Sequence, residues 1–521
     1  MKYVAEFGGS IALGVSQILS SQALDGEAFK GEAMKPCTLH PVPEYHAPFQ
    51  TIHGDLGNTR TRDCDAPLGV NTTVDSWNIP SFGPIFWDDK GRVTTTIVLE
   101  GGVAYLAALD PDTYEILTTY PSLNETSNVR LSSVIYTQVL GNRIIFPDND
   151  QHILEMERID TEDTTSFVKT RDTSLSGHIE ENAKLIGITH DSVGNVWFAT
   201  GGITTLHAAT ALSSTVGYIE PDGTIHATKL ENAQIENSFA VSGKRVFLVT
   251  GPAGSTDTPD AKGHLYALEA GPNGVDIVFT APYDAGSGIK NGALSRGSGA
   301  SPSLLGHKYV AVTDNADDQI HINIFRQHPD KTEDVKPICR APIFEAGEGA
   351  VENAMVSHWD GASTYSVIAN NFFNAPAAFQ LFTGRNWPLD DSLLNAPFNN
   401  LTQLAPGMVR VDLDEETMSC TTRWYNKDIR THLSPILSTR TGLLYVSTQD
   451  FDLAVKGSYQ YYLAAFDFQS GKEVWRVRKG AGGSFLATLP PVLTADGGVG
   501  QCVVRGFVKT RDSRLNPVES P

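Results

Sequence analysis

The sequence predicts an all-β protein that folds as a single β-propeller of eight four-stranded blades. Three observations predict this fold: a recurring hairpin pattern, a series of glycine turns, and the lack of any long stretch with helical periodicity. The sharpest hairpin is Gln460–Gly480, in which an apolar strand, a turn at Gly471 and an alternating strand follow one another. A single hairpin cannot bury both of its faces, so it needs neighbours of the same design.

Copies of this hairpin recur along the chain. Tyr105–Leu117 is a close copy, and Gly217–Lys229, Leu265–Phe279 and Met408–Trp424 are weaker ones. A second kind of turn, a glycine between two apolar runs, occurs at Gly91, Gly141, Gly194, Gly243, Gly306, Gly361, Gly442 and Gly497. These turns are mostly about 50–60 residues apart, a period typical of propeller blades and not of helical solenoids.

The domain boundaries follow from this repeat. Residues 1–36 are expected to be a leader that loosely resembles a secretory signal, 37–83 an irregular segment, and 84–521 the propeller. The last blade begins near Leu489 and is too short for four strands. Because a closed ring cannot leave that edge exposed, we expect part of residues 40–75 to supply the missing strand. Seven blades with an accessory hairpin is the alternative architecture.

Composition narrows the classes of partner. The formal net charge of −21 argues against nucleic acid and against anionic membranes, since both need a basic protein face. No apolar run has the length needed to cross a membrane, so membrane insertion is not expected. The oligomeric state is not indicated by the sequence.

The cysteines and sequons bear on the cellular location. The five cysteines show no metal-binding spacing, and we favour Cys37–Cys64 and Cys339–Cys420 as disulfides with Cys502 unpaired, although sequence does not determine pairing. Asn71, Asn124 and Asn400 begin glycosylation sequons, about as many as chance gives in a chain of this length. We expect the secretory pathway or the extracellular space, with the cytosol as the alternative.

Polar residues gather where the innermost strands of the blades begin. The expected topology brings these starts together at one mouth of the central channel, on the side of the longer loops. As acid–base or oxyanion-stabilising groups we select Glu236, Glu352, His432 and Arg296, and as substrate-binding groups Asn237, Asn353 and Arg130. The alternative is that Glu-Asn at a blade start hydrogen-bonds the neighbouring blade and only closes the ring.

The longest loop, Asn370–Gly407, is rich in aromatic residues. It contains Phe372, Phe373, Phe379, Phe382 and Trp387. Such density favours a lid over an apolar ligand, and a small core under the loop is the alternative.

At Tyr461–Arg478 the sequence resembles the quinoprotein alcohol dehydrogenase-like propellers, whose blades carry a similar strand, turn, Gly-Lys and Trp pattern. The resemblance implies a propeller over most of residues 84–515. It does not carry over the quinone chemistry, because enzymes of that family that use pyrroloquinoline quinone hold it near two adjacent cysteines. No two cysteines are adjacent in this chain.

The degenerate propeller, the paired starts Ile235–Ser238 and Val351–Ala354 and the aromatic loop are together similar to the fungal hetero-Diels–Alderases of tropolonic sesquiterpene biosynthesis. This resemblance implies a secondary-metabolism enzyme without a cofactor that acts on small apolar metabolites. Such an enzyme dehydrates a hydroxymethyl tropolone to a quinone methide and holds a terpene alkene against it. Acid–base groups and an aromatic lid are suited to these two steps.

Two other classes of function stay open. One is a lactonase or esterase that uses calcium, for which Asp314, Asn315, Glu236 and Glu352 would supply hard oxygen ligands. The other is a binding propeller without catalysis, against which the expected lid argues. Calcium is therefore the alternative to the absence of a cofactor.

Overall fold

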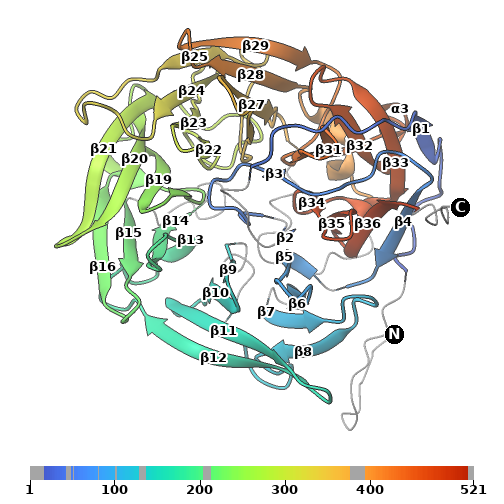
Figure 1. Cartoon of the computed structure of the whole chain (residues 1–521), viewed down its shortest axis with the longest axis horizontal. Coiled ribbons are helices and arrows are strands. Elements are labelled where there is room, and N and C mark those ends of the chain that lie inside the picture. Colours follow the sequence, from blue (N-terminus) through green and yellow to red (C-terminus); the bar gives the residue numbers. More distant parts are fainter. Residues whose placement is uncertain are drawn as a thin grey trace, which may run out of the picture.

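The computed structural model is a ring of eight β-sheets around a central axis (Figure 1). The structure describes residues 17–42, 49–50, 52–79, 81–99, 103–127, 129, 136–202, 213–375 and 393–513. Each sheet contains four consecutive strands or, in the last sheet, three strands and one from the N-terminal segment. The prediction of an eight-bladed propeller is confirmed.

The first four blades use chain-consecutive strands, with the first of each innermost. Blade 1 has β5 (Ser81–Trp87), β6 (Val93–Leu99), β7 (Val103–Leu109) and β8 (Ile116–Tyr120), and blade 2 has β9 (Gln138–Leu140), β10 (Arg143–Pro147), β11 (His152–Asp160) and β12 (Thr165–Ser174). Blade 3 has β13 (Lys184–His190), β14 (Val196–Gly201), β15 (Ser213–Ile219) and β16 (Ile225–Glu231). Blade 4 has β18 (Ala240–Ser242), β19 (Arg245–Pro252), β20 (Lys262–Gly271) and β21 (Gly274–Asp284), with β17 (Ala233–Gln234) also paired to β19.

The next blades follow the same order. Blade 5 has β22 (Ser303–Leu305), β23 (Tyr309–Thr313), β24 (His321–Arg326) and β25 (Cys339–Pro342), and blade 6 has β26 (Val356–Trp359), β27 (Thr364–Asn370), β28 (Met408–Asp414) and β29 (Ser419–Asn426). Blade 7 has β30 (Ile436–Ser438), β31 (Leu443–Gln449), β32 (Gln460–Asp467) and β33 (Glu473–Ala481), with β1 (Phe29–Gly31) added outside. Short helices, α3 (Phe451–Ala454), η3 (Gly254–Thr256), η4 (Pro397–Asn399), η5 (Leu401–Gln403) and η6 (Gly483–Phe485), lie in connections.

Blade 8 closes the ring with strands from both parts of the chain. It has β34 (Val492–Leu493), β35 (Val499–Val503), β36 (Gly506–Asp512) and β4 (Thr72–Trp77). β4 pairs antiparallel with β36, from Phe507 opposite Trp77 to Asp512 opposite Thr72. The edge of β36 is thereby covered, as expected for a closed ring, and the predicted closing strand from the N-terminal segment is confirmed.

All eight predicted glycine turns connect the first and second strands of successive blades. Each of these glycines has a positive φ, between 54° at Gly306 and 92° at Gly194. At Gly91 and Gly141 an added Cβ would meet no atom within 4 Å, so backbone conformation and not crowding requires glycine there. The repeat seen in the sequence is therefore a repeat of left-handed turns.

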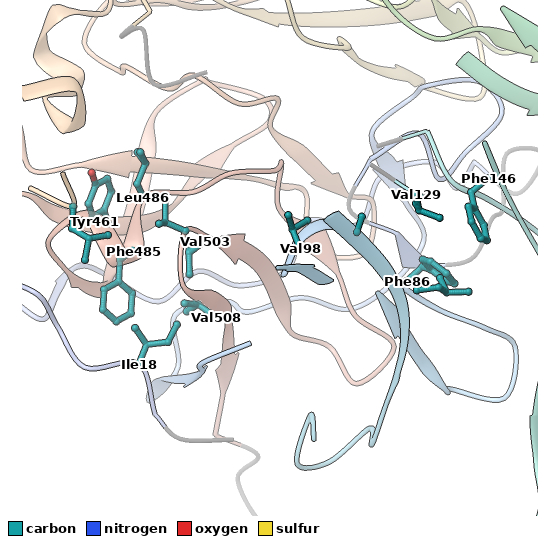
Figure 2. Packing of buried hydrophobic residues seen from close by; sticks show 14 of the residues in the cluster. Ile18, Phe86, Val98, Val129, Phe146, Tyr461, Phe485, Leu486, Val503 and Val508 are labelled. Carbon is teal, nitrogen blue, oxygen red and sulfur yellow. The ribbon is translucent and has the colours of Figure 1, made fainter. Parts of the chain in front are cut away.

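Apolar side chains fill the spaces between neighbouring blades. Between blades 7 and 8, Tyr445 and Trp475 are fully buried against Leu493 and Val499. The strand β32 at the centre of the sharpest predicted hairpin is buried at seven of its eight residues, as its apolar sequence predicts. Figure 2 shows part of another cluster, in which Ile18 packs beside the labelled side chains of blade 8.

The N-terminal segment threads the central channel, which the sequence analysis did not predict. It enters through β2 (Phe49–Gln50), which pairs with β5, and leaves through β3 (Thr61–Arg62), which pairs in parallel with β30 (Figure 1). Between these strands, backbone carbonyls of residues 56–60 accept hydrogen bonds from the inner strands of blades 4 to 7. The segment therefore lines the channel along the inner strands of these four blades.

Two cysteine predictions have different outcomes. Cys339 and Cys420 form a disulfide between the outer strands of blades 5 and 6, which confirms that pair. The predicted Cys37–Cys64 bond is wrong, since both are free thiols, as is Cys502. The physical reason is that each cysteine is held by its own backbone contact with the turn between β30 and β31 of blade 7. The Cys37 amide donates to the Thr441 carbonyl, and the Cys64 carbonyl accepts a hydrogen bond from the Ser438 hydroxyl.

The disulfide bears on the cellular location. Disulfides persist mainly in oxidising compartments, which agrees with the expected secretory pathway. Within the described residues, none of the helices combines the length and the apolar composition that a bilayer crossing requires.

Candidate active site at the blade starts

The threaded segment defines equivalent positions in four successive blades. The amides of Val241, Leu304, Ser357 and Leu437 donate to the carbonyls of Leu56, Gly57, Thr59 and Arg60 at 2.6–2.9 Å. The residue five positions before each of these donors is, in blade order, Glu236, Gly299, Glu352 and His432. Three of the four selected acid–base candidates thus occupy the same position of blades 4, 6 and 7, at one end of the ring.

The carboxyl groups of Glu236 and Glu352 meet across blade 5. Each residue is only 8% exposed, and the two side chains are hydrogen-bonded to each other. The intervening blade has Gly299 at this position, and a Cβ there would collide with the Glu352 carboxyl. Glycine at the middle position of the three therefore makes room for a contact between side chains two blades apart.

Both members of this carboxyl pair, Glu236 with Glu352, have raised pKa values. Burial raises the pKa of both carboxyls. The neighbouring charge of Glu236 raises the pKa of Glu352 further. Glu236 also accepts a hydrogen bond from Ser295, and Glu352 accepts one from the backbone of Leu294. Two carboxyls in contact repel each other when both are ionised, which favours the state of the pair that keeps one proton and can act as a general acid.

The neighbouring asparagines tie the blades together. Asn237 Nδ2 donates to the Gly299 carbonyl at 2.8 Å, and Asn353 Nδ2 donates to the His432 carbonyl at 3.3 Å. Each amide thus links the start of its own blade to the start of the next. The ring-closing alternative considered for Glu-Asn starts holds for both asparagines, although both also line the cavity described next.

A cavity of about 50 Å³ lies between Glu352 and the threaded segment. Its walls include Glu352, Asn237 and Asn353 from the blades and Ile52, His53, Asp55, Asn58, Arg60 and Arg62 from the segment. This volume holds a few water molecules and is well below the roughly 300–1,000 Å³ of sites that enclose a whole small molecule. Glu352 of the pair thus faces a small space whose walls are both polar and apolar.

The segment contributes site residues that sequence reasoning missed. His53 lies 3.2 Å from the Asn58 side chain, and the Arg60 guanidinium donates to the carbonyls of Pro435 and Pro491. Burial lowers the pKa of Arg60 to about 9. The only signal was the density of His, Asn and Arg in an otherwise irregular stretch, which gives no three-dimensional position.

His432 lies in a second buried cluster at the seam between blades 7 and 8. Its Nε2 lies 2.9 Å from the Ala487 carbonyl, to which it donates, and burial lowers its pKa to about 4. Nearby, Lys479 donates to Ser447 at 2.8 Å and to Gln501 of blade 8. Burial lowers the pKa of Lys479 to about 7. His432 is at the predicted end of the ring but is not among the residues that line the cavity.

Arg296 binds a loop instead of pointing to the cavity. Its Nε donates to the Gly286 carbonyl, and its terminal nitrogens donate to Asp257 and to the carbonyls of Thr258, Pro259 and Gly286. Its five N–H donors are all used in this way. This arrangement leaves no donor for a substrate oxygen, contrary to the predicted catalytic role.

The oxygen ligands proposed for calcium are not gathered around one point. Asp314 is paired with Arg340 at 2.8 Å and with His321 at 3.1 Å, and Asn315 donates to the Ala285 carbonyl. Among the residues that the structure describes, no group of three or more His, Cys, Asp or Glu is arranged to hold a metal ion.

The aromatic loop is described only in part. Phe372 is 1% exposed and packs with Ala350, Ala375 and Leu404, with Phe373 half-buried against them. These two residues form a small core under the loop, which was the alternative to a lid, so their predicted contact with a ligand is not supported. Phe379, Phe382, Trp387 and Arg130 lie outside the described residues.

The three sequons differ in their surroundings. Asn71 and Asn124 are exposed. Asn400 is half-buried, and its Oδ1 accepts hydrogen bonds from the amide and hydroxyl of Thr402 in the same sequon. Glycosylation at these positions stays a prediction.

Comparisons with known proteins identify no family for this chain. No protein-family model and no curated protein matches the sequence. Among solved structures, Sqt1 from Saccharomyces cerevisiae is 12% identical with a TM-score of 0.43, covering 84% of this chain and 96% of that one. BamB from Moraxella catarrhalis is 11% identical with a TM-score of 0.34, covering 72% of this chain and 95% of that one.

A 6-phosphogluconolactonase-like protein from Bacteroides fragilis is 13% identical with a TM-score of 0.37, covering 75% of this chain and 96% of that one. At this level of similarity the three comparisons concern the fold alone. The chain is an eight-bladed β-propeller whose ring is closed by its own N-terminal segment.

Proposed function

We propose that this chain is a cofactor-independent enzyme of secondary metabolism that carries out an acid-assisted dehydration followed by a cycloaddition. The substrate would be a hydroxymethyl tropolone, dehydrated to a quinone methide that then adds to a terpene alkene. The observation that supports this proposal is the buried carboxyl pair, whose pKa values are raised and whose Glu352 lines a small cavity. The resemblance of the paired blade starts to the fungal hetero-Diels–Alderases suggests the substrate class.

The carboxyl pair is suited to the first step. Loss of hydroxide from a hydroxymethyl group is slow unless the leaving oxygen is protonated, and a carboxyl group that keeps its proton at neutral pH can supply it. Such a general acid contributes a factor of about 10²–10⁴ to the rate.

The size of the cavity is compatible with this step. A hydroxymethyl group has two heavy atoms, so the cavity of about 50 Å³ can admit it, whereas a whole tropolone ring would not fit. The leaving water would remain among polar neighbours, including the Asn353 side chain. The edge of the ring that carries the hydroxyl would lie at the cavity mouth, and the rest of the ring would stay outside, toward the loops that connect the second and third strands. Holding the terpene against it is an orientation effect.

A lactone or ester hydrolase is the second candidate. The same cavity can hold a water molecule next to the carboxyl pair, and a water held there could attack a carbonyl. If calcium takes part, chelation would abolish that activity. A binding propeller without catalysis would show neither reaction.

The test is turnover by the purified protein. The protein is incubated with a hydroxymethyl tropolone and a terpene alkene, with and without EDTA, and products are followed by mass spectrometry. We expect an adduct that is insensitive to EDTA, and a loss of at least 100-fold in kcat for Glu352→Gln. The matched control is Glu345→Gln, an exposed glutamate paired with Lys427. Absence of the adduct above the uncatalysed rate would refute the proposal, and EDTA-sensitive lactone hydrolysis would support the second candidate.

A further inference from the structure

We propose that His53 is the general base of this site and that it works opposite the carboxyl pair. In this assignment His53 removes the proton of the tropolone hydroxyl while the carboxyl pair protonates the departing hydroxymethyl oxygen. The inference rests on the proposed function, which it deepens by naming the group that completes the dehydration.

The position of His53 follows from the threaded segment. His53 lines the same cavity as Glu352 and Asn237, although it is far from both in sequence. Its backbone carbonyl accepts a hydrogen bond from the Gln138 side chain of blade 2 at 3.3 Å. The segment thus delivers an imidazole to the cavity on which the carboxyl pair opens.

The neighbouring amide fixes the tautomer of the ring. Asn58 Nδ2 donates to the carbonyls of Phe239 and Pro302, so the side-chain oxygen of Asn58 is the atom that faces His53. This oxygen lies 3.2 Å from Nδ1 and accepts a hydrogen bond from it. With the proton on Nδ1, Nε2 carries the lone pair of the neutral ring, which is the form a base needs. The ring also hydrogen-bonds the Asn237 side chain. Because Nδ1 is bonded to Asn58, this second bond falls on Nε2, and a substrate hydroxyl must displace the Asn237 amide to reach the base.

The surroundings keep this ring neutral. Burial lowers the pKa of His53 to about 4, and the charge of Arg60 lowers it as well. The other titratable groups around the cavity are Arg62, Asp55 and Glu352, and the Tyr136 ring lies 5.3 Å from the imidazole. His53 therefore has a lowered pKa, and the facing carboxyl pair has raised pKa values. Two titratable groups pushed apart in this way are suited to act as base and acid at the same pH.

The proposed step balances in protons and electrons. His53 Nε2 takes the proton of the ring hydroxyl, and the electron pair of that O–H bond forms the carbonyl of the quinone methide. The ring electrons move to form the exocyclic C=C bond as the bond between CH₂ and OH breaks. The departing oxygen takes the proton of the carboxyl pair and leaves as water. Transfer of a proton from the His53 imidazolium to the carboxylate, through water in the cavity, restores both groups.

The backbone of the segment is strained at this point. His53, Asn58 and Arg60 have positive φ values of 49°, 50° and 52° although none is glycine. Residues held in the left-handed region cluster at functional sites, because the surrounding structure must compensate for their cost. Here the compensation comes from the hydrogen bonds to four blades.

The first experiment compares His53→Gln with the wild type and with His178→Gln, an exposed control. We expect His53→Gln to lower kcat at least 100-fold with KM changed less than threefold and with an unchanged Tm. We also expect the acid limb of the wild-type pH–kcat profile to disappear in this variant. A purely structural role would change Tm and would not remove that limb. Retention of half the wild-type kcat would overturn the role of His53 while leaving the proposed function intact.

The second experiment follows the ring nitrogens of the wild-type protein, labelled with ¹⁵N-histidine, by NMR. It therefore does not depend on whether the variant folds. We expect the His53 ring to be neutral, with its proton on Nδ1, from pH 8 down to about pH 5. Titration near pH 6.5, or a proton on Nε2, would overturn the assignment irrespective of activity. If the wild type forms no adduct at all, the proposed function fails and the role of His53 in it fails too.

Discussion

Two buried polar clusters at the same end of the ring differ in one respect. In the carboxyl pair, Glu236 with Glu352, the Glu352 side chain lines a cavity shared with His53. The seam cluster, His432 with Lys479, lies between blades 7 and 8, and neither residue lines that cavity. Both clusters have strongly shifted pKa values. The difference teaches that burial alone shifts a pKa, and that only a neighbouring space allows the shifted group to meet a substrate.

The largest effect is expected at the seam, from Lys479→Met. The lysine pKa is about 7 in the fold and 10.5 when unperturbed, a difference that corresponds to at most about 5 kcal/mol. The folded state binds protons less tightly, so its cost is fully present below pH 7 and vanishes as pH rises to about 10.5. We expect a higher free energy of unfolding for the variant at pH 7 and a shrinking advantage toward pH 10, measured by denaturant titration.

The control for this lysine is Lys427→Met, since Lys427 is exposed and paired with an exposed glutamate. It should change stability by less than about 1 kcal/mol at every pH. A Lys479→Met protein that is less stable than the wild type at pH 7 would contradict the description of the seam.

His432→Ala should separate the two clusters next. Removing a buried ring whose Nε2 donates to the Ala487 carbonyl leaves a void and an unpaired acceptor, so we expect a loss of about 2–4 kcal/mol in stability. Because His432 does not line the cavity, kcat below the melting transition should change less than threefold. Thermal unfolding and turnover, measured on one preparation, distinguish a structural role of His432 from a catalytic one. A large fall in kcat with an unchanged Tm would restore His432 as a catalytic residue.

Gly299→Ala tests the room that the carboxyl pair needs. The new Cβ would collide with the Glu352 carboxyl, so we expect a loss of about 1–3 kcal/mol in stability and a clear fall in kcat. Gly288→Ala is the control, because a Cβ at Gly288 meets no atom within 4 Å. Equal effects of the two substitutions would show that crowding at Gly299 is unimportant.

The smallest effect is the pH dependence of stability caused by the carboxyl pair. Because the pKa of Glu352 is raised in the fold, the folded state holds its proton more tightly and becomes less stable as pH rises above the unfolded value of 4.5. Glu352→Gln should remove part of this loss, so the variant should gain stability relative to the wild type as pH rises from about 5 to about 8. Glu345→Gln should follow the wild type, and a parallel pH course for all three proteins would count against a shared proton.

Much of the fold could be predicted because the blades repeat. The eight glycines mark the same left-handed turn in every blade, and their spacing is visible without any knowledge of contacts. The closing strand could be predicted because β36 would otherwise leave an edge exposed. In the sequence, Glu236 and Glu352 appear in two similar blade starts, and nothing there indicates that their side chains meet.

Other features of the site could not be predicted. The threaded segment is held by hydrogen bonds from strand amides to its carbonyls, and such bonds place no constraint on residue type. His53 and Asn58 therefore carried no recognisable pattern. Arg296 was misassigned because an arginine at a blade start is equally suited to bind loop carbonyls, and only the positions of Asp257 and Gly286 decide which it does.

The sequence by itself determined the propeller class and the hairpins of the blades, because local periodicity and turn chemistry repeat every blade. It favoured eight blades closed by an N-terminal strand, and the structure decided against seven. Only the tertiary structure decided which polar groups share a space. It placed Gly299 between two glutamates, brought the segment with His53 to the cavity, and buried Lys479 between blades 7 and 8. The physical reason is that the charge state of a group depends on burial and on neighbours distant in sequence, which no local pattern records.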